Sequence, residues 1–173
     1  MPKRRENQRR FTKPKPAVGL KELSDGNWEF VHPKCAEERA DDIEDVEQML
    51  AMGEFDVARD ELRWLLSECS EFITAHKMLG EIAMGDEDLK LARAHFGYAY
   101  HAGNLALEHA SVAAGLLYDL PANRDFLEAA KGLAWSLQQL NKVDEALRIA
   151  EQLVQLDPSD PLDVKSWITD WKA

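Results

Sequence analysis

Cysteines, enzyme motifs and long apolar runs are scarce or missing in this chain of 173 residues, and each lack excludes a class of protein. Two cysteines are too few for a disulfide framework, so we expect reduced thiols and a cytoplasmic protein. No apolar run reaches the length of about 18 residues that a membrane-spanning helix needs. The first 16 residues are basic but lack the apolar stretch of a secretory signal.

The patterns of common enzymes are missing as well. The sequence contains no GxxxxGK[ST], GxSxG, HExxH or GxGxxG motif. Acidic pairs such as Asp41-Asp42 and Glu44-Asp45 fall at predicted helix starts, where a carboxylate interacts favourably with the helix dipole. We therefore predict a protein that is not an enzyme, with no catalytic residues and no cofactor.

Charge is distributed unevenly along the sequence. Residues 1–15 hold seven basic residues and one acidic residue, a net charge of +6, which leaves −17 for the rest of a chain whose total is −11. Prolines and few apolar residues accompany this basic cluster, so we predict a disordered arm over residues 1–26 and a folded domain over 27–173. An acidic domain repels nucleic-acid phosphates, and the arm alone could attract them.

Three interpretations of the arm stay open. It is a solvated tail without a partner, or it binds RNA or DNA, or it docks on the acidic domain and competes there with a ligand. The residues that would contact nucleic acid are Lys3, Arg4, Arg5, Arg9 and Arg10.

Helical periodicity begins at Glu37 and continues to the end of the chain. Apolar residues recur three or four positions apart, as in the stripe Ile43, Val46 and Leu50. Trp28–Val31 alternates apolar and polar residues, but His32-Pro33 follows, which favours an extended lead-in over a sheet strand. The sequence predicts an all-α protein.

Three alanines divide the helical region into similar units. Ala58 and Ala92 lie 34 residues apart, and Ala92 and Ala146 lie 54 apart, which is the same interval with 20 residues inserted. A large apolar residue stands three positions before each alanine. Such a fixed interval indicates a repeat architecture.

These units resemble the tetratricopeptide repeat. The match is carried by Leu79-Gly80, Ala92 and Phe96 in one unit and by Leu133-Ala134 in another. The resemblance extends to a group of small bacterial repeat proteins, and it implies a right-handed stack of antiparallel helix pairs. The predicted parts are the repeats 39–72, 73–106 and 127–160, an extra inserted helix within 105–124, and a capping helix over 161–171. Stacking of three repeats buries a continuous core.

The resemblance also implies a concave groove lined by the first helix of each pair. Its mixed polarity, with one tryptophan, suits an extended peptide or a partner helix. The predicted groove residues are Glu47, Lys77, Glu81, Lys131, Trp135 and Gln138. Trp135 could instead be buried against the insertion. The expected function is a protein–protein interaction scaffold, and the alternative is an RNA- or ribosome-associated factor held by the arm.

Four residues form a weak candidate metal site. His32, Cys35, Cys69 and His76 could converge at one end of the first helix pair, and histidine and cysteine are the ligands that zinc prefers. The spacing matches no known zinc finger. We therefore favour a buried pair of thiols with two packing histidines, and predict no metal.

Overall fold

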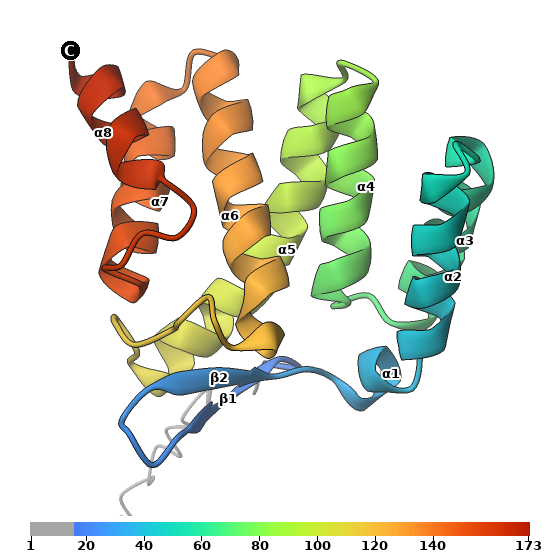
Figure 1. Cartoon of the computed structure of the whole chain (residues 1–173), viewed down its shortest axis with the longest axis horizontal. Helices are drawn as coiled ribbons and strands as arrows, with labels where there is room; N and C mark the ends of the chain where they lie inside the picture. The colour runs from blue at the N-terminus through green and yellow to red at the C-terminus, as the bar shows by residue number, and fades with distance from the viewer. Residues whose placement is uncertain (1–15) are drawn as a thin grey trace, which may run out of the picture.

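The computed structural model describes residues 16–173, and this part of the chain is mostly helical, as the sequence predicts (Figure 1). A hairpin of two strands and one helical turn precede the long helices. In chain order the elements are β1 (Gly19–Glu22), β2 (Trp28–Val31), α1 (Lys34–Glu37), α2 (Ala40–Ala51), α3 (Phe55–Glu68), α4 (Ile73–Gly85), α5 (Leu89–Ala110), α6 (Pro121–Gln139), α7 (Val143–Leu156) and α8 (Val164–Lys172). The basic cluster of residues 1–15 lies outside the described residues.

From α2 to α8 each helix packs against the next, and tight turns join α2 to α3, α4 to α5 and α6 to α7, which we call the three helix pairs. The turn inside each pair is built in the same way. Gly53, Glu87 and Asn141 take positive φ angles of 78°, 62° and 59°. The next residue's N–H then donates to the carbonyl five positions earlier, at 2.9 Å in all three turns. This is the Schellman arrangement that ends helices, and it recurs here at intervals of 34 and 54 residues.

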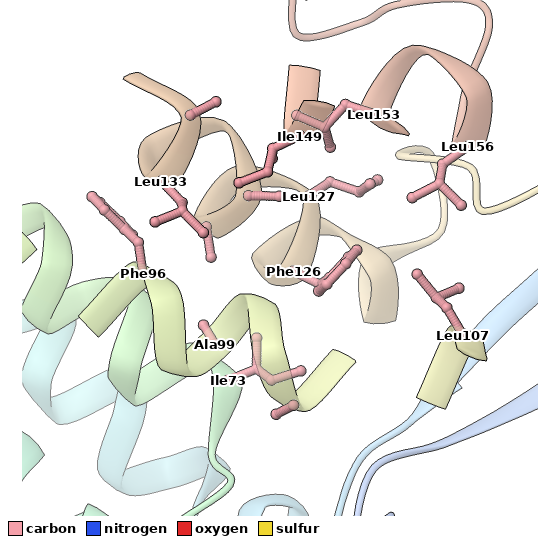
Figure 2. Packing of buried hydrophobic residues seen from close by; sticks show 14 of the residues in the cluster. Ile73, Phe96, Ala99, Leu107, Phe126, Leu127, Leu133, Ile149, Leu153 and Leu156 are labelled. Atoms are coloured by element: carbon pink, nitrogen blue, oxygen red, sulfur yellow. The ribbon is translucent and has the colours of Figure 1, made fainter. Parts of the chain in front are cut away.

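Close packing between pairs depends on glycines that face phenylalanine rings. A Cβ atom at Gly80 of α4 or Gly132 of α6 would lie 2.6–2.7 Å from the ring of Phe96, which α5 contributes. Phe96 and Leu133 both belong to the larger apolar core, which is shown in Figure 2. The side chain of Phe96 is therefore held between two helices that lack side chains at the contact.

The prediction of an extra inserted helix is wrong. Helix α5 continues through Gly103-Asn104 to Ala110, residues 111–120 form a loop, and α6 begins at Pro121. Gly103 lies inside α5 and not at its end. It faces Phe126, whose ring would lie 2.3 Å from a Cβ atom at that position. The additional residues thus lengthen two existing helices and add a loop between them.

The N-terminal part of the described chain also differs from expectation. Trp28–Val31 is a sheet strand, pairing antiparallel with Gly19–Glu22, so residues 16–26 are not the disordered segment that we predicted. No local pattern indicates this strand, because the residue that holds it in place lies far along the chain. Asn123 of α6 is fully buried; its Oδ1 accepts from the Phe30 N–H and its Nδ2 donates to the Trp28 carbonyl, both at 3.0 Å.

The C-terminal helix α8 packs against α7 close to where the cap was predicted. Val164 is buried in the core and Trp167 and Trp171 contact each other, with ring centroids 5.3 Å apart. Within residues 16–173, no helix combines the length and the apolar character that crossing a membrane requires.

Candidate functional site

The candidate site is a groove on the face formed by α2, α4 and α6, the helices nearest the viewer in Figure 1. It consists of two adjoining cavities. The acidic pocket, of about 490 Å³, lies between α1, α2 and α4, and the aromatic pocket, of about 520 Å³, lies between α4, α6 and α8. Glu81 lines both cavities, so they form one surface along the first helix of each pair.

A lysine surrounded by carboxylates lies at the centre of the groove. The Lys77 Nζ atom is 2.9 Å from Asp125, 2.9 Å from Glu128 and 3.7 Å from Glu81. Burial alone would lower the pKa of Lys77, but Asp125 and Glu81 oppose this effect and Glu128 adds a hydrogen bond, so its pKa is raised. Lys77 therefore stays protonated and joins α4 to α6.

The pKa of Glu81 is raised as well. Burial is the main cause; Lys77 opposes it, and the neighbouring carboxylates of Glu128 and Asp125 add to it. Three carboxylates share one ammonium group, so the centre of the groove carries an excess of negative charge. A cationic group placed beside Glu81 would favour its ionised form.

Hydrogen bonds hold the other two carboxylates in place. The Thr74 hydroxyl donates to Asp125 and the Tyr118 hydroxyl donates to Glu128, each at 2.6 Å. Tyr118 comes from the loop 111–120, so the residues between α5 and α6 help to position the groove carboxylates. The result is an acidic surface held by hydrogen bonds, which is suited to binding a cation.

The aromatic pocket has a different character. Met84, Trp135, Leu162 and Trp167 give it a largely apolar lining. The Lys131 Nζ atom donates to the Leu162 carbonyl at 2.7 Å and lies 4.9 Å from the centroid of the Trp167 ring. The charge of Lys131 is thus occupied by the C-terminal segment, and the pocket presents mainly apolar surface.

The structure brings five of the six predicted groove residues to these cavities. Glu47, Lys77 and Glu81 line the acidic pocket, and Lys131 and Trp135 line the aromatic pocket. Trp135 is half-buried at the pocket wall and is not covered by the insertion. Gln138, also half-buried, lines neither cavity.

Sequence reasoning missed Asp125 and Trp167. Asp125 precedes Glu128 by three residues, so it lies on the same face of α6, and Pro121 as a helix start was the signal that this turn is helical. Trp167 lies beyond the third repeat. Its place in the groove depends on how the cap folds back, which no local pattern indicates.

The expectation of reduced thiols is wrong. Cys35 and Cys69 form a disulfide with a Cα–Cα distance of 5.8 Å, tying α1 to the end of α3. Disulfides are typical of oxidising compartments, so the argument from reduced thiols for a cytoplasmic protein no longer holds.

The four candidate metal ligands do not assemble into a site. His32 Nε2 donates to the Ala122 carbonyl at 2.8 Å and His76 Nε2 donates to the Ser70 carbonyl at 3.0 Å. The cysteine sulfurs are bonded to each other, and no group of three or more His, Cys, Asp and Glu residues suited to a metal occurs within residues 16–173.

A pair of histidines lies between α4 and α5 on the opposite side of α4. The ring of His76 is stacked with Tyr98 at 5.2 Å between centroids, and its Nδ1 is 3.5 Å from that of His95. Burial lowers the pKa of both histidines, and for His95 the charges of His76 and Arg63 act in the same direction. Both rings are therefore neutral near pH 7 and serve packing.

Comparison with known proteins supplies no family: no protein-family model matches the sequence, and no curated protein matches it.

Proposed function

We propose that this protein is a non-catalytic scaffold whose groove binds an extended segment of a partner protein. One observation carries the proposal: a continuous surface, acidic at one end and aromatic at the other, runs across the first helix of all three pairs. Grooves that bind peptides combine a few fixed charges with aromatic anchors in this manner.

A tetratricopeptide-like stack is the architecture that we infer for this scaffold. Its support is the recurrence of one turn at Gly53, Glu87 and Asn141, and the complete burial of Ala58 and Ala92, together with Ala146, at the helix contacts. In such a stack the first helices form the concave side, and in this chain α2, α4 and α6 line the two cavities.

The chemistry of the groove favours a basic partner segment with an apolar side chain. The acidic pocket presents Glu37, Glu47, Glu81 and Asp125 against the ammonium group of Lys77. In the adjoining aromatic pocket, Trp135 and Trp167 offer ring faces to an apolar or cationic side chain. A lysine or arginine in the acidic pocket and an aliphatic or aromatic side chain in the aromatic pocket would satisfy both ends.

Selection from a random peptide library tests this proposal. We expect the full-length protein to enrich peptides with a net positive charge and at least one large apolar residue. Glu47→Lys should weaken binding about tenfold, which corresponds to about 1.4 kcal/mol, because it reverses a charge in the acidic pocket. The matched control is Glu44→Lys, which reverses the charge of an exposed residue on the same helix that lines neither cavity.

A second pair of variants addresses the aromatic pocket. Trp135→Ala should weaken the same peptides, whereas Gln139→Ala, which changes an exposed residue of α6, should leave binding unchanged. Titration calorimetry measures both, and circular dichroism confirms that each variant folds. Peptides that bind all four variants equally would mean that the groove is not the binding site.

The alternative function, an RNA- or ribosome-associated factor, stays a prediction from the charge of residues 1–15. If it is correct, nucleic acid should co-purify with the full-length protein and be lost when Lys3, Arg4, Arg5, Arg9 and Arg10 are changed to glutamine. Phosphate contacts would also make the binding strongly dependent on salt.

A further inference from the structure

We propose that residues 1–15 of this same chain occupy the acidic pocket, so that an incoming partner has to displace them. This inference rests on the proposed function, because it takes the groove as the binding site and adds its regulation. The segment would act as an internal competitor for the acidic pocket. Three observations support this inference: charge, the path of the chain and the length of the segment.

The first observation is charge complementarity. Residues 1–15 carry a net charge of +6, and the acidic pocket presents four carboxylates against one lysine. Glu37 and Glu47 are exposed, and the side-chain carboxylate of neither forms a hydrogen bond or ion pair with any residue in the range 16–173. Two carboxylates at the pocket mouth thus lack a cationic partner among the described residues, on a chain whose first residues are rich in arginine.

The second observation is where the described chain begins. β1 pairs antiparallel with β2, which places Gly19 opposite Val31. The residue after Val31 is His32, and His32 lines the acidic pocket. Val18, directly before β1, is fully buried. The N-terminal segment therefore joins the hairpin at the end nearest the groove, and not at its Ser24-Asp25 turn.

The third observation is reach. Fifteen residues span up to about 50 Å when extended, which exceeds the roughly 18 Å length of α2. A short tether also gives the segment an effective concentration in the millimolar range, so weak contacts with the carboxylates suffice for occupancy. At about 0.1 M salt the interaction extends over roughly 10 Å, and high salt shortens that range.

A spin label on the segment tests the proposal in the intact protein. Both native cysteines are in the disulfide, so Gln8→Cys supplies a single reactive thiol for the label. We expect the label to broaden the amide signals of Glu47 and Thr74 in NMR spectra. The signals of Arg63 on α3 and Tyr98 on α5, on the outer helices, should keep their intensity.

Charge variants provide the controls for this measurement. Changing Lys3, Arg4, Arg5, Arg9 and Arg10 to glutamine should restore the groove signals, as should Glu47→Lys, whereas Glu44→Lys should not. The same five glutamines should also raise the affinity for selected basic peptides several-fold, because the competitor is gone. Broadening that is absent, uniform, or confined to the outer helices would overturn the inference.

The outcomes separate this inference from the proposed function. If peptides bind in the groove but the label leaves Glu47 and Thr74 unaffected, the inference is wrong and the scaffold function stands. If the label broadens the groove signals but no library peptide binds even the variant with five glutamines, the segment is the groove's own ligand and the scaffold function is wrong. Broadening that RNA abolishes while leaving peptide affinity unchanged would assign the arm to nucleic acid and overturn the inference.

Discussion

At the scale of single residues, close packing of the helices depends on glycines that face aromatic rings. Phe96 inserts between Gly80 and Gly132, and Phe126 lies against Gly103. Three helices thereby approach each other across two aromatic rings. Because both rings are buried and tightly packed against these glycines, an added methyl group would press directly on them.

Replacing Gly80 with alanine should therefore lower the free energy of unfolding, by about 1–3 kcal/mol, although alanine has the higher helix propensity. Gly97→Ala on α5 is the control. Its Cβ atom would meet only Leu133, at 4.0 Å, so we expect a neutral or stabilising effect of up to about 1 kcal/mol. Urea denaturation measures both variants, and equal effects would contradict this account of the contact.

At the scale of secondary-structure elements, the ends of the helix pairs were predictable and the connections between distant elements were not. Gly53 and Asn141 signal turns in the sequence because few other residues adopt a positive φ angle. Gly103 carries the same local signal but serves a contact with Phe126, 23 positions further along the chain. A glycine at a turn and a glycine at a helix crossing look alike until the neighbouring helix is placed.

The groove shows the same division. The prediction of Glu47, Lys77 and Glu81 comes from the resemblance to the tetratricopeptide repeat, which implies that the first helix of each pair lines a groove. The hydrogen bond from Tyr118 to Glu128 and the folding back of Trp167 depend on a loop and a terminal helix. Periodicity gives no information on either.

The disulfide belongs to this scale, since it fastens the single turn of α1 to the C-terminal end of α3. It closes a loop of 34 residues, and cross-links of this length contribute about 2–4 kcal/mol to stability. We expect the melting temperature to fall when a strong reductant is added, and to fall similarly in a Cys35→Ser/Cys69→Ser variant. The variant itself should not respond to the reductant.

Thiol titration under denaturing conditions checks the bond directly. The purified protein should show no free thiol without reductant and two with it. Two free thiols in protein purified without reductant under air would contradict the disulfide. Because Ala36 and Glu37 of α1 line the acidic pocket, reduction should also weaken binding of the selected peptides.

At the scale of the whole molecule, the hairpin ties together parts of the stack that are far apart in sequence. In a repeat array each unit contacts only its neighbours, so the ends can fray independently. Here β1 contacts α5 and β2 contacts α6, while α1 is linked to α3. Residues 19–37 therefore bridge all three helix pairs.

Asn123→Ala tests this coupling. The substitution removes buried hydrogen bonds to Phe30, Trp28 and Leu117, each worth about 1 kcal/mol, and leaves buried backbone groups without a partner. We expect a loss of about 2–4 kcal/mol. In hydrogen exchange, the amides of β2 should lose protection more than those of α3. Asn104→Ala, which changes a polar residue near the surface of α5, should cost much less.

The Asn123 contact also has a consequence for the order of events during synthesis. Residues 19–31 leave the ribosome before their hydrogen-bonding partner on α6, which follows roughly 90 residues later, several seconds afterwards at typical rates of elongation. Until then the edges of the hairpin and the ring of Phe30 have nowhere to be buried. The hairpin thus cannot reach its final place before α6 has been made, and during this interval its apolar surface is exposed to aggregation.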